Sequence, residues 1–154
     1  MMNIYWVCKS FKELNTNELY EILHIRQLVF ILEQICPYLD ADKKDYKAWH
    51  LLGYDSEGNL VAYARLLPKG VSYQEYSSIG RVLSLPSVRR SGVGKELMSM
   101  VMQEMERLFP AQSICISAQS YLVPFYETFG FINTGKEYLE DDIPHTEMIK
   151  WTTL

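Results

Sequence analysis

RVLSLPSVRRSGVGKELMSM, residues 81–100, joins an apolar, strand-like segment to a run with helical spacing. Two adjacent arginines, Arg89 and Arg90, and two glycines, Gly92 and Gly94, stand at the junction. The first N–H groups of a helix have no partner within the helix and carry the positive end of its dipole. Glycines at this place let an anion approach those groups without a Cβ in the way. The stretch therefore predicts a phosphate-binding loop.

Two better-known phosphate loops do not fit these residues. A Walker loop needs a glycine five residues before its Gly-Lys-Ser/Thr, but Arg89 holds that position and Glu96 follows Lys95. The dinucleotide fingerprint needs a small residue where Leu97 stands. A merely tight strand-to-helix turn would explain one glycine, but it would leave the two arginines without a role.

Composition narrows the class of protein. A chain of 154 residues with 48% hydrophobic content can bury one core, and no linker or repeat divides it, so we expect a single domain over residues 1–154. A net charge of −4 argues against nucleic acid as a partner, because phosphate binding depends on concentrated Lys and Arg. Without a leader or a membrane span, a cytoplasmic protein is expected. Three scattered cysteines predict reduced thiols and no metal site.

The order of the remaining elements predicts a mixed sheet. Strands are expected at residues 3–8, 48–54, 60–67, 77–84 and 114–119, with two more around an acidic turn in residues 131–151. Helices are expected after a capping box at Asn15 and Glu18, over residues 95–109, and from Pro124. Hairpins at both ends of the chain exclude a doubly wound parallel sheet.

A family resemblance rests on two motifs in this order. Arg89-Arg90-Ser91-Gly92-Val93-Gly94 matches the Q/R-x-x-G-x-G/A signature of the GNAT acyltransferases, whose helix N-terminus holds the coenzyme A pyrophosphate. Phe125-Tyr126-x-x-Phe129-Gly130-Phe131 resembles their second cofactor element. Further segments are similar to the ElaA-like branch: VFILEQ (29–34), CPY (36–38), HLLG (50–53), YAR (63–65), IGRV (79–82) and EDDIPH (140–145).

The resemblance implies both a fold and an activity. The fold would be the α/β (α+β) GNAT fold, with a single mixed sheet of six or seven strands that splays between its fourth and fifth strands, flanked by about four helices. The activity would be an acetyl-CoA-dependent N-acetyltransferase, which moves an acetyl group to a primary amine by direct attack in a ternary complex. The protein would act as a monomer or homodimer with no metal.

The resemblance also implies positions for coenzyme A. Its pantetheine arm would contact the main chain of a strand, with a backbone N–H near Leu83 polarising the thioester carbonyl. Tyr126 resembles the tyrosine that donates to the coenzyme A sulfur, although an aromatic at this place can also serve packing. Ser120 stands where many relatives carry Asn. The expected cofactor-binding residues are Val82, Leu83, Ser84, Arg89, Arg90, Ser91, Gly92, Val93, Gly94, Lys95, Ser120 and Tyr126.

The general base and the acceptor contacts are left open by the sequence. Glu33, His50 and His145 are all candidates for the base, with His50 also a candidate for substrate binding or a hydrogen-bonded strand residue. Arg81 interrupts an apolar strand, so it needs either a substrate or an ion-pair partner. Acidic segments at 40–45 and 140–142 would favour a cationic acceptor such as an amine or polyamine, or they are simply solvated surface loops.

A second function class remains. The chain could keep the phosphate-binding loop and serve as a coenzyme A-binding module or regulatory subunit with little catalysis. Retention of Tyr126 favours the enzyme.

Overall fold

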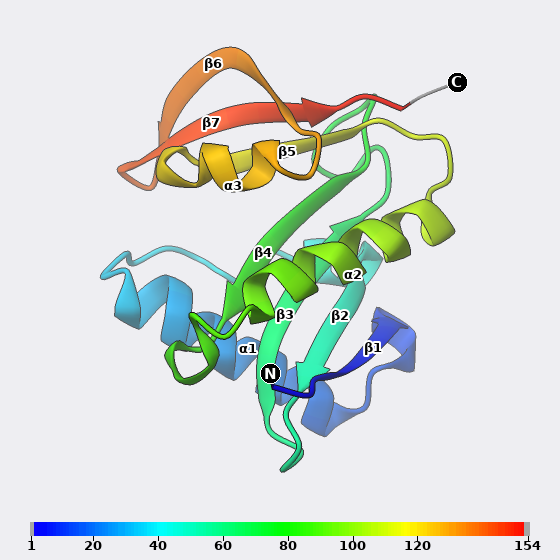
Figure 1. Ribbon diagram of the computed structural model, residues 1–154, viewed down its shortest axis with the longest axis vertical. Coiled ribbons are helices and arrows are strands. Elements are labelled where there is room, and N and C mark those ends of the chain that lie inside the picture. Colours follow the sequence, from blue (N-terminus) through cyan, green and yellow to red (C-terminus); the bar gives the residue numbers. More distant parts are fainter. Residues whose placement is uncertain (1, 153–154) are drawn as a thin grey trace.

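The computed structural model describes residues 2–152, and its strands form two sheets (Figure 1). The first sheet is antiparallel, in the order β1 (Tyr5–Ser10), β2 (Trp49–Tyr54), β3 (Leu60–Leu67) and β4 (Ser78–Ser84). The second is also antiparallel, in the order β5 (Ile114–Gln119), β7 (Ile143–Lys150) and β6 (Ile132–Glu140). The seven expected strands are therefore present, with the first beginning two residues later than the sequence predicts.

The two sheets are joined by backbone pairing where β4 and β5 begin. Ser77 forms a parallel bridge with Ile114, and its carbonyl accepts a hydrogen bond from the Cys115 N–H at 2.9 Å. The Ser78 hydroxyl donates to the Cys115 carbonyl at 2.7 Å. Beyond these contacts the strands are no longer paired. The expected opening between the fourth and fifth strands is confirmed, and it divides what we expected to be one sheet into two.

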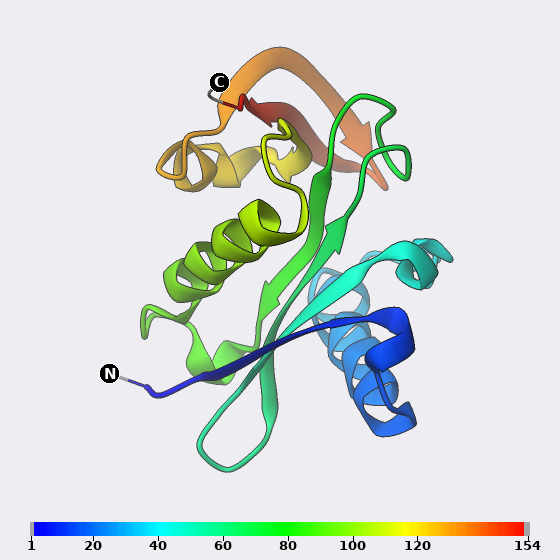
Figure 2. The ribbon, with the colours of Figure 1, turned by 90° about the vertical axis from the view of Figure 1, so that its right-hand side faces the viewer.

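Helices cover both faces of the first sheet, as Figure 2 shows. The described residues contain α1 (Thr16–Arg26), α2 (Val93–Leu108) and α3 (Val123–Glu127), and a π-helical segment, η2 (Gln27–Glu33), continues α1. The capping box is confirmed, since the Glu18 N–H donates to the Asn15 side chain at 2.7 Å and the Asn15 N–H to that of Glu18 at 2.9 Å. Three α-helices thus stand where about four were expected.

Apolar side chains of the two long helices form the core on either side of the sheet. The α2 residues Leu97, Met98 and Met105 are buried, which confirms that its methionines pack in the core. On the opposite face, Ile22 and Ile25 of α1 pack with Tyr63, Leu83 and other side chains of the sheet. Burial of one such side chain stabilises the fold by about 1.5–3 kcal/mol.

None of the helices within residues 2–152 has the length and apolar composition that a membrane crossing requires.

Candidate functional site

A bulge in β4 lies beside the opening between the sheets. Leu83 pairs with Tyr63 and Gly80 pairs with Arg65, so Arg81 and Val82 together face a single residue of β3. Arg81 accommodates the extra residue with a φ of 53°. The bulge bends the strand at its midpoint.

Backbone N–H groups on the free edge of β4 are exposed by this arrangement. The Leu85 N–H donates to the Val61 carbonyl at 2.9 Å, and successive N–H groups of a strand point to opposite sides. Leu83 therefore directs its N–H into the ladder with β3, while Val82 and Ser84 direct theirs toward the opening. The donor expected near Leu83 is accordingly not the N–H of Leu83 itself.

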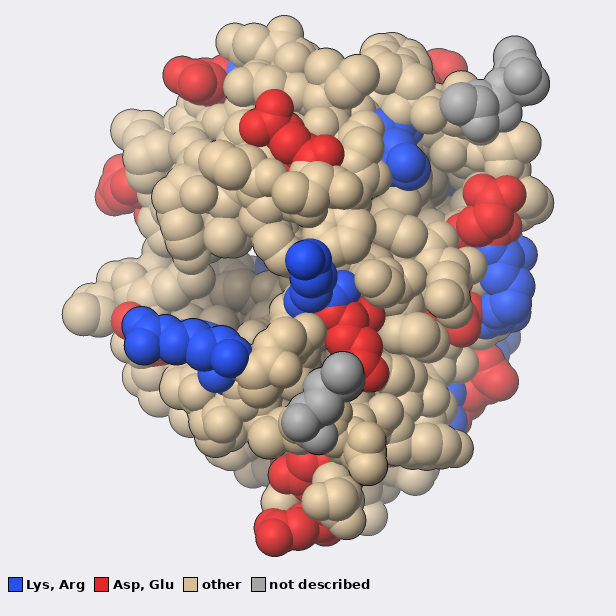
Figure 3. All heavy atoms as spheres, viewed as in Figure 1, with Lys and Arg blue, Asp and Glu red and all other residues tan. Residues whose placement is uncertain are grey.

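A cavity of about 960 Å³ occupies the opening, and Figure 3 shows a hollow in this face of the molecule. Its walls come from η2, β4, β5, β7 and α3. The structure brings together in these walls the following residues that the sequence singled out: Glu33, Arg81, Val82, Leu83, Ser84, Arg89, Tyr126 and His145.

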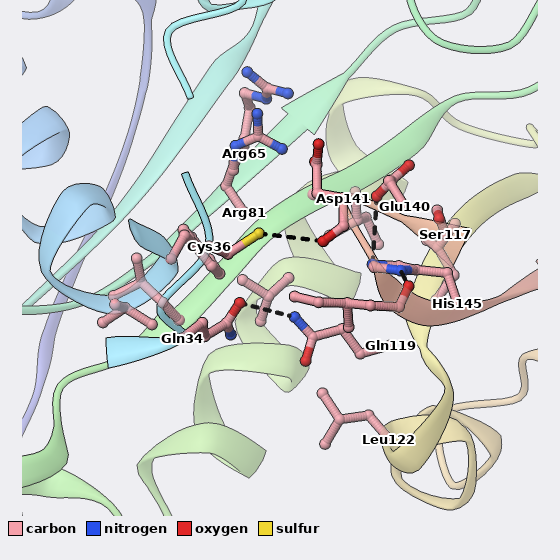
Figure 4. A pocket seen from close by; sticks show the side chains of 18 of the residues that line it. Gln34, Cys36, Arg65, Arg81, Ser117, Gln119, Leu122, Glu140, Asp141 and His145 are labelled. Carbon is pink, nitrogen blue, oxygen red and sulfur yellow. Dashed lines mark hydrogen bonds and ion pairs between the residues drawn. The ribbon is translucent and has the colours of Figure 1, made fainter. Parts of the chain in front are cut away.

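Two contacts join the N-terminal half of the chain to the second sheet at this cavity (Figure 4). The Gln119 side-chain amide donates to that of Gln34 at 3.3 Å. The Cys36 thiol donates to the Asp141 carbonyl at 3.4 Å. Both contacts cross the gap between the sheets, so they hold its walls in place.

The predicted phosphate-binding loop has the backbone geometry that an anion needs. Gly92 precedes α2 with a φ of 86°, and no side chain caps the helix. The Glu96 N–H makes the first turn's bond to the Gly92 carbonyl at 3.1 Å, which leaves the N–H groups of Val93, Gly94 and Lys95 without helical partners. A Cβ on Gly92 or Gly94 would meet no atom within 4 Å. These residues fit a diphosphate at the helix start.

Some charged and polar side chains around this loop are exposed and can contact a ligand, whereas others are already hydrogen-bonded within the protein. Arg90, with a φ of 64°, and Lys95 are exposed. Arg89 instead donates to the Ser84 carbonyl at 3.0 Å and pairs with Glu33, and the Ser91 hydroxyl donates to the Val88 carbonyl. Arg90 and Lys95 are thus free to meet phosphate, whereas Arg89 is already paired.

Tyr126 is buried in the wall of the cavity. Its side chain is 8% exposed, and its ring packs edge-on against Phe125 and Phe131. Within residues 2–152 the Tyr126 hydroxyl has no hydrogen-bond partner. Burial raises the pKa of Tyr126 to about 12, so the phenol keeps its proton. A protonated hydroxyl that lines the cavity without a partner in the described chain is suited to donate to a bound group.

His145 lies on β7 with one ring nitrogen occupied and the other beside a carboxylate (Figure 4). Nδ1 lies 2.7 Å from the Ile143 carbonyl, so it carries the proton in the neutral ring. Nε2 is 3.3 Å from Glu140 Oε2, and the ring stacks on Tyr138. Nε2 can therefore accept a proton, and Glu140 stabilises the resulting cation.

Several residues that the sequence proposed for the site do not line the cavity: residues 90–95, which form the phosphate-binding loop, and His50 and Ser120. His50 is fully buried, with Nδ1 2.6 Å from the Tyr63 hydroxyl and Nε2 3.1 Å from the Asp45 carbonyl. Burial lowers the pKa of His50, which keeps the ring neutral. This placement gives His50 a packing role in place of the expected substrate contact. The Ser120 hydroxyl is 2.8 Å from that of Thr146 and does not line the cavity.

The acidic side chains in residues 40–45 form ion pairs with arginines. Asp40 accepts from Arg26 and Arg81, each at 2.8 Å, so the ion-pair alternative for Arg81 is the one observed. Asp42 and Asp45 accept from Arg65 at 2.8 and 3.1 Å. These carboxylates are neutralised by arginines, which removes them as evidence for a cationic acceptor.

Sequence reasoning assigned no role to several residues of the cavity, notably Lys44, Arg65 and Gln119. The signal for Arg65 was available, since it is the one charged residue in β3, all of whose residues are buried. Lys44 and Gln119 carry no local signal, because only the fold brings them to the same cavity.

Comparison with known proteins agrees with this geometry. Residues 29–151 match the family model of the acetyltransferase (GNAT) domain. The chain is 38% identical to Protein ElaA of Escherichia coli over 149 residues and 40% identical to a UPF0039 protein of Synechocystis over 148 residues, and each match covers 96% of both chains.

Solved structures share the whole fold. The crystal structure of Escherichia coli ElaA has a TM-score of 0.89 at 37% identity, and an acyl-CoA N-acyltransferase from Pseudomonas aeruginosa has the same score at 39% identity. Each match covers 96% of this chain and 99% of the other. The chain therefore belongs to the GNAT acetyltransferase family, in the branch that contains ElaA and the UPF0039 proteins.

Proposed function

We propose that this protein is an acetyl-CoA-dependent N-acetyltransferase, which acetylates a primary amine by direct attack within a ternary complex. The observation that carries the proposal is the Tyr126 hydroxyl, which keeps its proton, has no partner within the described chain and lines a cavity that begins beside the phosphate-binding loop. A protonated phenol that lines the cavity without a partner in the chain can donate a hydrogen bond to a bound group.

Binding of the acyl donor would use the free backbone groups. The N–H groups of Val93, Gly94 and Lys95 and the charge of Arg90 would hold the diphosphate. Val82 and Ser84 would bond the pantetheine arm along the free edge of β4. When bound, acetyl-CoA supplies a thioester whose carbonyl carbon is open to attack. We expected a backbone N–H near Leu83 to polarise that carbonyl. The Val82 N–H, at the bulge, is the donor that would fill this role.

Two residues would carry out the proton transfers, one as acceptor and one as donor. His145 Nε2 takes a proton from the amine as its nitrogen bonds to the carbonyl carbon, and Glu140 stabilises the imidazolium. Tyr126 donates its proton to the departing sulfur as the C–S bond breaks. Return of the His145 proton through solvent to Tyr126 restores both groups, so the transfer yields an amide and a free thiol.

Glu33 is the weaker candidate for the base. Both of its carboxylate oxygens accept from Arg89, at 2.5 and 2.7 Å. These hydrogen bonds lower the pKa of Glu33, which makes the carboxylate a poorer proton acceptor.

An acceptor screen tests the proposal. The protein is incubated with acetyl-CoA and a panel of amines, and mass spectrometry follows the acetylated product while a thiol reagent follows coenzyme A release. Transfer predicts equal amounts of the two products. Binding of acetyl-CoA in a thermal-shift assay without any acetylated amine would instead support the coenzyme A-binding module.

A further inference from the structure

The cavity ends, away from the phosphate-binding loop, in a cluster of cationic side chains. The phosphate-binding loop follows the Ser84 end of β4, and Ser78 at the other end lies roughly 20 Å away for a strand of this length. Lys44, Arg65 and Arg81 line this farther part of the cavity, with Arg81 at the bulge and Arg65 opposite Gly80 just beyond it. In Figure 4, Arg65 and Arg81 extend on one side of the pocket, and Glu140, Asp141 and His145 lie on the other.

The charges of this cluster do not balance. Four cations, Arg26, Lys44, Arg65 and Arg81, face the three carboxylates of Asp40, Asp42 and Asp45, which leaves one positive charge. Within residues 2–152, Lys44 has no carboxylate within 4 Å, and its Nζ donates only to the Ser72 hydroxyl at 2.9 Å. One monoanion from outside the protein would neutralise the cluster.

Two donors of the cluster have no partner within the described chain. The Arg65 side chain is 3% exposed, yet its Nε is buried without a hydrogen bond. Arg81 uses Nε and Nη2 on Asp40 and Asp42, while its Nη1 makes no bond. The Arg65 Nε has almost no accessible surface, so the donor that a bound anion can reach is Nη1 of Arg81, whose side chain is 21% exposed.

Open space lies next to Arg65. Gly80 is its cross-strand partner, so a side chain at position 80 would stand on the same face of the sheet. A Cβ built on Gly80 meets no atom within 4 Å, and Gly80 lines the cavity. The absent side chain therefore leaves room for a ligand beside the buried guanidinium.

We infer that the acceptor is an amino acid, a small molecule that carries one carboxylate and one primary amine. The inference rests on the proposed function. Its carboxylate binds at Lys44, Arg65 and Arg81, and its amine lies toward Glu140, Asp141 and His145. Those acidic side chains attract the ammonium form, which loses one proton to solvent, and His145 takes a second proton as the resulting neutral amine attacks the thioester. A single carboxylate matches the one unbalanced charge, whereas a phosphate dianion would exceed it.

Matched acceptor pairs test the inference. Amino acids with the amine at the α, β or γ position are compared with amines that lack only the carboxylate, by kcat/KM at saturating acetyl-CoA. The best amino acid is expected to exceed its matched amine by about 10- to 100-fold, as befits charged hydrogen bonds. Equal rates, or a preference for the simple amines, would overturn the inference. A preference for phosphoethanolamine over β-alanine would overturn the carboxylate assignment.

Variants locate the effect in the cluster. Lys44→Gln keeps a side chain that can bond Ser72 but removes the charge, and Gly80→Val fills the open space with a residue suited to a strand. Each is expected to reduce the ratio of kcat/KM for the amino acid to that for its matched amine by about 10-fold, mainly by raising the KM for the amino acid. Lys47→Gln, an exposed lysine outside the cavity, is the matched control and should keep the preference. An unchanged preference in both cluster variants would contradict the site.

Equilibrium binding separates this inference from the proposed function. The best amino acid is titrated calorimetrically into the protein saturated with coenzyme A, which requires no turnover. Binding that Lys44→Gln weakens, without acetylation of any amine, would sustain the carboxylate site and reject the enzyme. Acetylation of simple amines, without binding of amino acids, would sustain the enzyme and reject the carboxylate site.

Discussion

Arg89 and Glu33, 56 residues apart in the chain, form a bidentate ion pair at the cavity. Nη1 and Nη2 of Arg89 donate to the two carboxylate oxygens of Glu33 at 2.5 and 2.7 Å, and Nε donates to the Ser84 carbonyl at 3.0 Å. The pair joins the end of η2 to the entrance of the phosphate-binding loop. Two residues proposed for separate roles thus restrain each other.

Release of Arg89 from this pair should strengthen coenzyme A binding. Glu33→Gln leaves the guanidinium charge unbalanced near the diphosphate, and an exposed pair of this kind is worth about 0.2–1 kcal/mol. We expect calorimetry at low salt to show about two- to fivefold tighter binding, with the gain lost as salt rises. Glu104→Gln, which breaks another exposed pair on α2, is the control. Weaker binding in Glu33→Gln would show that the pair itself organises the loop.

The phosphate-binding loop should fail when its second glycine gains a branched side chain. Gly94→Val places a side chain over the free N–H groups at the start of α2, in space that no protein atom fills. Acetyl-CoA binding should be abolished and that of Gly94→Ala reduced, while both melting temperatures stay close to the wild type. Unchanged affinity in the valine variant, measured by calorimetry, would refute the assignment of the diphosphate to this loop.

The three histidines should respond differently to the same substitution. His145→Gln removes the proposed base and should lower kcat by about 10²- to 10⁴-fold. His24→Gln, exposed on α1, should change neither activity nor stability. His50→Gln breaks a buried contact with Tyr63 and should lower the melting temperature. If His145→Gln retained full turnover with the best acceptor, the base would have to be sought elsewhere.

Acid should weaken the arginine–aspartate cluster. Partial burial raises the pKa of Asp42, but hydrogen bonds from Arg65 and its charge outweigh this and lower the pKa to about 2. Because the unfolded value is about 4, the stabilisation is present above pH 4 and is lost as pH falls toward 2. Asp42→Asn should cost about 1–3 kcal/mol at pH 7.

Thermal unfolding over a pH series checks this expectation. The difference in melting temperature between wild type and Asp42→Asn should shrink as the pH falls from 5 to 3. A difference that stays constant over this range would mean that Asp42 does not hold its charge against Arg65.

Local sequence signals account for much of the fold and part of the site. The glycines at the start of α2, the capping box at Asn15 and the methionine stripe of α2 could be predicted, because each depends on residues within one or two turns. The Glu33–Arg89 pair and the three-arginine cluster could not, because their partners lie 14 to 56 residues apart. The bulge at Arg81 was equally hidden, since β4 reads as an ordinary strand in which only the pairing with β3 reveals an extra residue.

Turnover of Tyr126→Phe, with the melting temperature and acetyl-CoA affinity measured on the same preparation, tests the central claim most directly. The hydroxyl bonds nothing within the described chain, so its removal should leave stability and affinity nearly unchanged and lower kcat by about 10²- to 10⁴-fold. Tyr20→Phe, exposed on α1, is the matched control. Normal turnover in Tyr126→Phe, with or without a lowered melting temperature, would contradict the account.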